Sequence, residues 1–287
     1  MKRIYSLVFC LCAVFMFAQD QVSAKMIREM ISQDVKNLNI KPENIFKTEN
    51  KMVDGIPVRL YFPDASKHKK IIYNIHGGAL IGGDLETHEN ISRKLANKTQ
   101  SVVIALDYRK APENPFPKSL EDVAAVYRWI IKNQKEITGN SQPISVVGDS
   151  GGALLAAALQ VKIKRDDLLS NIAKVVYVNP AFDVRNPGNA LYAKVAQWYL
   201  AGSDANSELA SPMVTKDFSV FVPCLIIENE KDILLAQAKA FEEKLKLAKV
   251  PYETVLIPNE DHFGGLWAAA HPRTDLAFDR VAAFLNR

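Results

Sequence analysis

The strongest constraint on the fold is a Gly-Asp-Ser-Gly-Gly run at residues 148–152, because of the segments on either side of it. Residues 143–147 are rich in β-branched residues, as in a buried strand, and residues 153–162 are rich in helix formers. A chain that passes from strand to helix at a serine makes a sharp, strained turn, and flanking glycines avoid side-chain clashes there. The run therefore predicts a nucleophile elbow, with Ser150 at the N-terminal end of the following helix.

The same five residues also occur in the nucleophile segment of chymotrypsin-like proteases, so the surrounding sequence has to decide between the two. Those enzymes are all-β proteins in which histidine and aspartate precede the serine along the chain. Here a helix-forming segment follows Ser150 directly, and no Ala-Ala-His-Cys-like segment precedes it. The context excludes a trypsin-like fold and favours an α/β protein.

Apolar, β-branched segments alternate with helical segments along the rest of the chain. Apolar residues fall at helical spacing within 27–38, 120–131, 238–248 and 278–285. Strands that are apolar throughout are buried on both faces, as in a parallel sheet between two layers of helices. We therefore expect an α/β fold with a mostly parallel, eight-stranded sheet whose first strands pair as a hairpin. The expected strands are Ile45–Glu49, Val58–Phe62, Ile71–Ile75, Val102–Leu106, Ile144–Val147, Val175–Val178, Leu225–Ile227 and Glu253–Ile257.

A second glycine-containing segment, His76-Gly-Gly-Ala79, follows the third expected strand directly. Acyl transfer builds negative charge on the substrate's carbonyl oxygen, and each backbone N–H aimed at it contributes about 3 kcal/mol. Glycines allow the backbone to turn successive N–H groups into one cavity. The expected oxyanion donors are Gly77, Gly78, Ala79 and Gly151. We expect His76 and Asp149 to support these motifs, with His76 orienting the loop rather than transferring a proton.

A base and an acid for Ser150 are expected later in the chain, on loops that follow the last strands. Asp232 follows the seventh expected strand, and His262 follows the eighth, 30 residues later. One helix and one strand fit in that separation, so both loops reach the same edge of the sheet. His262 would take the proton of Ser150, and Asp232 would orient and stabilise the imidazole. Asp183, after the sixth strand, is the alternative acid.

The first two dozen residues differ from the rest of the chain. Lys2 and Arg3 precede a short apolar run that ends at Ala18, and small residues follow at positions 22–24. The apolar run is too short to span a bilayer, and the pattern is typical of a secretory signal peptide. We expect a signal peptide over residues 1–24, cut after Ala24 or alternatively after Ala18, and a secreted or periplasmic protein.

Composition narrows the classes of partner. With 287 residues, 48% of them hydrophobic, and a net charge of only +4, the chain can bury one large core and offers no strongly basic face for nucleic acid. No later segment approaches transmembrane length, so we expect no stable membrane anchor. Cys224 is the one cysteine after residue 24, in an apolar setting typical of a buried thiol. No metal or cofactor is expected, and the sequence carries no indication of an oligomeric state.

Together these motifs resemble the hormone-sensitive-lipase-like family of α/β-hydrolases, which includes bacterial carboxylesterases. The resemblance covers about residues 55–285 and includes a specific charged and proline-rich run at 107–117 and Ser-Pro-Met at 211–213. Two positions depart from the family's pattern: Ala79 stands where a third glycine is usual, and Gly151 where alanine is usual. The Asp-His-Phe run at 261–263 is similar to that of kynurenine formamidases on the same fold.

The resemblance implies a serine carboxylic ester hydrolase that acts on small short-chain or aryl esters through an acyl-enzyme intermediate. It implies one α/β-hydrolase domain over 25–287, with a small cap from about residues 25–44 and 182–212. The cap is expected to contribute pocket residues, and the candidates are Leu191, Tyr192, Trp198 and Tyr199. An arylformamidase-like amide hydrolase is the alternative function, and a non-catalytic binding protein on the same fold is a further one.

Overall fold

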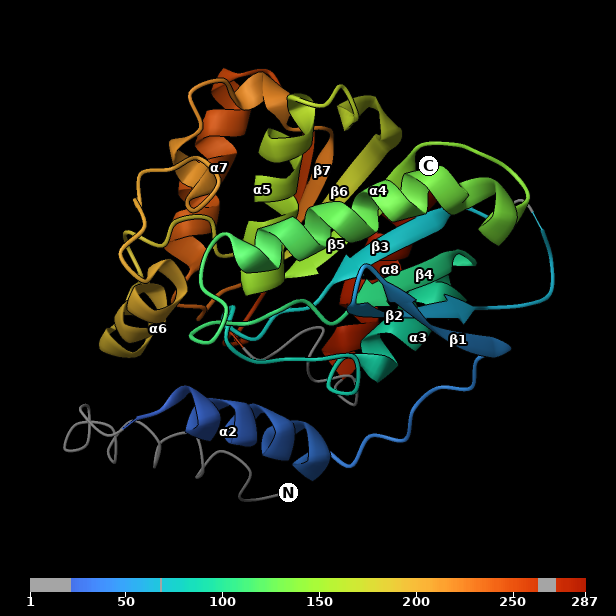
Figure 1. Cartoon of the computed structure of the whole chain (residues 1–287), viewed down its shortest axis with the longest axis horizontal. Coiled ribbons are helices and arrows are strands. Elements are labelled where there is room, and N and C mark those ends of the chain that lie inside the picture. The colour runs from blue at the N-terminus through green and yellow to red at the C-terminus, as the bar shows by residue number, and fades with distance from the viewer. Residues whose placement is uncertain (1–21, 68, 263–271) are drawn as a thin grey trace.

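One sheet organises the described part of the chain, which comprises residues 22–67, 69–262 and 272–287 of the computed structural model (Figure 1). Its strands are β1 (Lys47–Val53), β2 (Ile56–Phe62), β3 (Ile71–Ile75), β4 (Val102–Leu106), β5 (Ile144–Asp149), β6 (Ile172–Val178), β7 (Cys224–Asn229) and β8 (Tyr252–Ile257). They follow the order β1-β2-β4-β3-β5-β6-β7-β8. β1 and β2 form an antiparallel hairpin, β2 pairs antiparallel with β4, and all later pairs are parallel. The expected mostly parallel, eight-stranded sheet is confirmed.

The first strand of the N-terminal hairpin begins and ends later than the sequence predicts, since β1 runs from Lys47 to Val53 rather than from Ile45 to Glu49. The second strand ends at Phe62 as predicted. Asp54 and Gly55 both have left-handed backbone conformations, with φ of 51° and 83°. This is the two-residue turn whose twist matches that of antiparallel strands. Most of β1 is exposed, and most of its residues are polar. The strand therefore lacks the alternation of apolar and polar residues by which a half-buried strand is recognised in a sequence.

Helices cover both faces of the sheet. On one face lie α4 (Lys118–Thr138), α5 (Gly151–Lys164) and α7 (Leu235–Leu247), and on the other lie α3 (Glu89–Thr99) and α8 (Pro272–Asn286) (Figure 1). Two separate apolar clusters fill the layers: Tyr127, Leu155 and Phe241 belong to the first, and Leu95 and Phe278 to the second. The expected α/β sandwich is confirmed, and its central strands β3, β4, β5 and β7 are buried on both faces.

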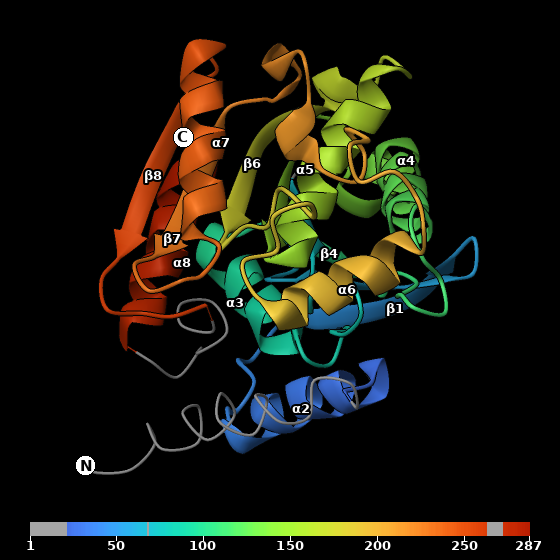
Figure 2. The same cartoon turned by 90° about the vertical axis from the view of Figure 1, so that its left-hand side faces the viewer.

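Two further helices, α2 (Ala24–Asn37) and α6 (Ala190–Leu200), lie beyond the edge at which the parallel strands end (Figure 1). Figure 2 shows both at the same, lower side of the domain. They fall in the two segments expected to form the cap. Ser23 caps α2 by accepting a hydrogen bond from the backbone N–H of Met26 at 3.2 Å. No helix in the described residues has the length and apolarity to cross a membrane.

The expected signal peptide lies outside the described residues as far as position 21, as do Cys10 and Cys12. Cys224, at the start of β7, is buried as expected. Burial raises the pKa of its thiol to about 12. The thiol therefore stays protonated at neutral pH and contributes to the core rather than to chemistry.

Candidate active site

Ser150 lies on a strained turn between β5 and α5. Its φ of 51° and ψ of −117° are values that residues other than glycine rarely adopt. The helix approaches β3 so closely that a Cβ at Gly152 would lie 2.1 Å from the carbonyl oxygen of Ile75. Glycine is therefore required at position 152, and the strand–turn–helix that the motif predicts is present.

Three side chains from three loops form one hydrogen-bonded chain at this edge of the sheet. His262 Nε2 lies 2.9 Å from Ser150 Oγ, and His262 Nδ1 lies 2.8 Å from Asp232 Oδ2. A carboxylate at Nδ1 favours the tautomer with its proton there, which leaves Nε2 to accept the proton of the serine. Asp232 is almost fully buried, and its second oxygen accepts a hydrogen bond from the N–H of Leu234 at 2.8 Å. The arrangement can remove a proton from Ser150 and stabilise the resulting imidazolium.

The alternative acid is engaged elsewhere. Asp183 forms a bidentate ion pair with Arg185, in which Nε lies 2.8 Å from Oδ1 and Nη2 lies 2.7 Å from Oδ2. This pairing lowers the pKa of Asp183, although burial alone would raise it. Of the two acids that the sequence offers, the structure brings Asp232 to His262.

The loop after β3 adopts the backbone that an oxyanion hole needs. Gly78 has a φ of 112°, and Ala79 has a left-handed φ of 57°. A Cβ at Gly78 would lie 2.4 Å from the carbonyl of Gly82, so the loop folds back tightly on itself. Within residues 22–67, 69–262 and 272–287, the N–H groups of Gly78, Ala79 and Gly151 donate to no protein acceptor. The alanine that departs from the family's pattern is thus accommodated, at a cost of about 1–2 kcal/mol relative to glycine.

Gly77 has a different role from the one expected. Its N–H donates to Asp149 Oδ1 at 3.0 Å, so it is not available to a substrate oxygen. Asp149 is buried, with its other oxygen 3.5 Å from His88 Nε2. Burial raises the pKa of Asp149, but the neighbouring His88 and His76 and the Gly77 N–H outweigh burial and lower the pKa overall. Asp149 therefore holds the start of the loop. No motif in the sequence indicates the participation of His88.

His76 supports the loop from its other side, as expected. Its Nδ1 lies 2.7 Å from the carbonyl oxygen of Gly77, and its ring stacks on Tyr108 with 4.2 Å between centroids. Burial lowers the pKa of His76 and favours the neutral ring. The Tyr108 hydroxyl donates to the carbonyl oxygen of His76 at 2.9 Å, and Ala111 N–H donates to that of Leu80 at 3.2 Å. The conspicuous run at 107–117 thus braces the glycine loop.

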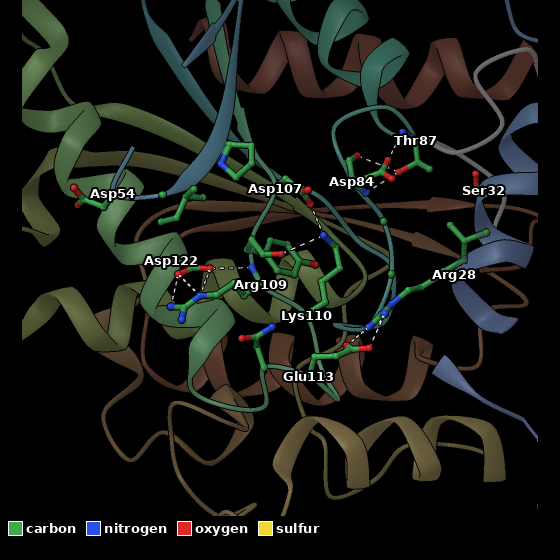
Figure 3. A pocket seen from close by; sticks show the side chains of 18 residues that line it. Arg28, Ser32, Asp54, Asp84, Thr87, Asp107, Arg109, Lys110, Glu113 and Asp122 are labelled. Carbon is green, nitrogen blue, oxygen red and sulfur yellow. Dashed lines mark hydrogen bonds and ion pairs between the residues drawn. The ribbon is translucent and has the colours of Figure 1, made fainter. Parts of the chain in front are cut away.

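The N-terminal helix also holds this loop, through a residue that the sequence did not single out. Arg28 Nε donates to the carbonyl oxygen of Ile81 at 2.5 Å, and Nη2 donates to that of Ala111 at 2.7 Å. Both terminal nitrogens also contact Glu113, as Figure 3 shows. Arg28 therefore ties α2 to the glycine loop and to the 107–117 run at once.

A small cavity of about 50 Å³ lies beside Ser150, between α5 and α6. Most of its lining is apolar, and α6 contributes Tyr192, Val195 and Ala196. Of the four pocket candidates from the sequence, only Tyr192 lines this cavity. Leu191 and Trp198 pack as half-buried side chains against the core. Tyr199 is buried against Phe116, with ring centroids 5.6 Å apart. The other three residues therefore do not line this cavity. Tyr199 lies on the same face of α6 as Tyr192 but two turns further along the helix, and Leu191 and Trp198 lie on a neighbouring face.

A second and larger cavity, of about 690 Å³, lies between α2, the β1–β2 turn and the loops at 82–87 and 107–114 (Figure 3). Its walls are polar, and its three cationic side chains are all paired: Arg28 with Glu113, Arg109 with Asp122 and Lys110 with Asp107. None of the three residues of the serine–histidine–aspartate chain lines it. In the described part of the chain, no three His, Cys, Asp or Glu side chains gather as a metal site.

Comparisons with known proteins agree with this geometry. The model of a family described as having the α/β-hydrolase fold matches residues 72–264. The esterase LipI of Mycobacterium tuberculosis is 32% identical over 249 residues, which cover 77% of this chain and 75% of the relative. The arylesterase of Saccharolobus solfataricus is 30% identical over 210 residues, covering 68% of each chain. Among solved structures, an esterase of Pyrobaculum calidifontis has a TM-score of 0.86 and 26% identity, with 93% of both chains covered.

Replacing Arg28 by alanine should loosen the N-terminal helix. The substitution leaves the buried carbonyl of Ile81 without its donor, which costs about 1–3 kcal/mol. We expect the midpoint of urea denaturation to fall and limited proteolysis within α2 to become faster. Lys25→Ala is the matched control, because Lys25 lies on the same helix and makes only an exposed pair with Glu29. Equal denaturation midpoints for the two variants would contradict the role of Arg28.

Proposed function

Because the chain belongs to the α/β-hydrolase superfamily, in its hormone-sensitive-lipase-like family, we propose that it is a serine carboxylesterase whose nucleophile is Ser150. The observation that carries the proposal is the continuous contact from Ser150 through His262 to Asp232, at 2.9 and 2.8 Å. Chain order supports it as well, since serine, aspartate and histidine follow one another as in other α/β-hydrolases. The names of its relatives, which include carboxylesterase, arylesterase and ethyl acetate hydrolase, support an ester as the substrate.

In the acylation step, Ser150 Oγ attacks the ester carbonyl carbon while its proton passes to His262 Nε2. Asp232 stabilises the imidazolium, and negative charge collects on the former carbonyl oxygen. The free N–H groups of Gly78, Ala79 and Gly151 are the donors for this oxygen, with Gly77 now excluded because Asp149 occupies its N–H. The C–O bond to the alcohol then breaks, and the leaving oxygen takes the proton from Nε2.

In the deacylation step, a water molecule attacks the acyl-enzyme carbonyl and gives a proton to His262 Nε2. The tetrahedral intermediate collapses, the bond from Ser150 Oγ to the acyl carbon breaks, and the proton returns to the serine. The products are a carboxylic acid and an alcohol.

The size of the cavity beside Ser150 supports a short acyl group. The cavity measures only about 50 Å³. We infer that it takes an acetyl or propionyl group more readily than a longer acyl chain. Leu154 and Val195 contribute apolar walls, which suit an aliphatic chain better than a polar one. We therefore favour short-chain esters, with the alcohol part toward the open side of the site.

Substitution of the serine tests the function directly. Ser150→Ala should lower kcat for p-nitrophenyl acetate by at least about 10³-fold, because no nucleophile remains to form the acyl-enzyme. Ser145→Ala is the matched control, since Ser145 is a buried serine at the opposite end of the same strand. It should keep activity within a few-fold of the wild type. Equal hydrolysis by wild type and Ser150→Ala would rule out the mechanism.

A chain-length series tests the acyl group. We expect kcat/KM for p-nitrophenyl esters to fall by about 10²-fold or more between propionate and hexanoate, because each of the three added methylenes without room costs about 1–3 kcal/mol. Val195→Ala should shift the preference toward longer chains, and Ala196→Phe should restrict it to acetate. Ala193→Phe, on the same helix but outside the cavity lining, should leave the profile unchanged. Comparable turnover of N-formyl-kynurenine would instead favour the amide-hydrolase alternative.

We also propose that residues 1–24 are a secretory signal peptide, which makes the protein secreted or periplasmic. Cleavage after Ala24 would remove Ser23, the cap of α2, whereas cleavage after Ala18 would retain it. Mass spectrometry of the exported protein should give a mature chain that begins at Lys25, or at Gln19 for the alternative site. Recovery of the protein with Met1 intact and inside the cell would contradict the proposal.

A further inference from the structure

The histidine of the hydrogen-bonded chain comes from a loop rather than from a regular element. His262 lies five residues beyond the end of β8, outside the helices and strands of the described residues. Its Nε2 must nevertheless stay within hydrogen-bonding distance of Ser150. A displacement of about 1 Å at such a site can cost about 10²-fold in rate. Some contact has to position this loop.

One such contact comes from Asn179, directly after β6. Its Nδ2 donates to the carbonyl oxygen of His262 at 3.1 Å, and its side chain is buried. Asn179 has a left-handed φ of 45°, which asparagine tolerates better than most residues. The residue before it, Val178, accepts the N–H of Ser150 at 2.9 Å, and Ala181 N–H donates to Ser150 O at 3.2 Å. The same short segment therefore holds the backbone of the serine and the backbone of the histidine.

The second contact comes from Asn229, the last residue of β7. Its Nδ2 donates to the carbonyl oxygen of Asp261 at 2.5 Å, and the residue is fully buried. Its own carbonyl oxygen accepts the N–H of Asp232 at 3.1 Å. Asn229 therefore joins the loop of the acid to the loop of the histidine. Lys231 N–H adds a further link between these loops by donating to Glu260 O at 2.8 Å.

We propose that Asn179 and Asn229 are positioning residues, which set His262 between Ser150 and Asp232 by binding successive backbone carbonyls of its loop. The inference rests on the proposed esterase function. The two residues lie at the ends of adjacent parallel strands, Asn179 directly after β6 and Asn229 as the last residue of β7. The segment of Asn179 also holds the backbone of Ser150, and Asn229 borders the loop that carries Asp232. Because both are buried, losing either donor leaves a carbonyl oxygen without compensation by water. The loop then shifts, and the distance from Nε2 to the serine changes with it.

Asn179→Leu and Asn229→Leu test the inference, because leucine has the branching and the number of side-chain heavy atoms of asparagine but neither a hydrogen-bond donor nor a charge. We expect kcat for p-nitrophenyl acetate to fall about 10- to 100-fold while KM changes less than about twofold. Asn171→Leu is the matched control. Asn171 also donates from Nδ2 to a backbone carbonyl, that of Leu168 at 3.2 Å, but at the opposite end of β6. Its kinetics should match the wild type.

A double-mutant cycle separates positioning from a general loss of folding. In a His262→Ala background the residual activity no longer depends on the imidazole, so adding Asn179→Leu should lower it no further. An equal loss in both backgrounds, or a circular dichroism spectrum showing an unfolded variant, would overturn the inference in favour of a structural role. Wild-type kcat for both leucine variants would also overturn it. Failure of the proposed function is seen separately, as activity that survives Ser150→Ala.

Discussion

The strained backbone of Ser150 is the constraint on which the rest of the site depends. A left-handed serine between β5 and α5 is maintained only because the helix packs against β3 at Gly152, where a Cβ would lie 2.1 Å from a carbonyl oxygen. That packing draws on the large apolar cluster between α5 and the sheet. The free energy of the core thus offsets strain of about 1–3 kcal/mol at one residue. The strained turn places the Ser150 hydroxyl and the N–H of Gly151 next to each other, where both can act on the same substrate carbonyl.

Around this turn, the site is assembled by hydrogen bonds between loops rather than by side-chain packing. Asp149 holds the start of the glycine loop, Arg28 holds its end, and the 107–117 run supports its middle. On the opposite side of the serine, Asn179 and Asn229 hold the loop of the histidine. A buried polar group that loses its hydrogen-bond partner costs free energy. Each of these hydrogen bonds therefore favours the one arrangement of the loop in which it can form. The donors and the base are thereby set before a substrate arrives.

The sequence identified the sheet, the nucleophile elbow and the hydrogen-bonded serine, histidine and aspartate because each of these leaves a pattern along the chain. Ser150 stands between a strand and a helix, and chain order with the counted strands located Asp232 and His262. Contacts between segments that are distant in the sequence leave no local pattern. For that reason the sequence did not predict the roles of Arg28 and Asn179. The role of Gly77 was mistaken for the same reason, since its N–H is bound by Asp149. A motif shows which residues are near the site, but hydrogen bonds between distant segments decide what each of them does.

The central claim is that Ser150 forms the covalent intermediate with His262 as its base. The most direct measurement is mass spectrometry after reaction with diethyl p-nitrophenyl phosphate, which transfers a phosphoryl group to an activated serine. The account predicts one diethylphosphoryl group per chain, on the peptide that contains Ser150, and a much slower reaction in His262→Ala. Stoichiometric labelling of a different residue, or equal labelling of Ser150→Ala, would contradict it.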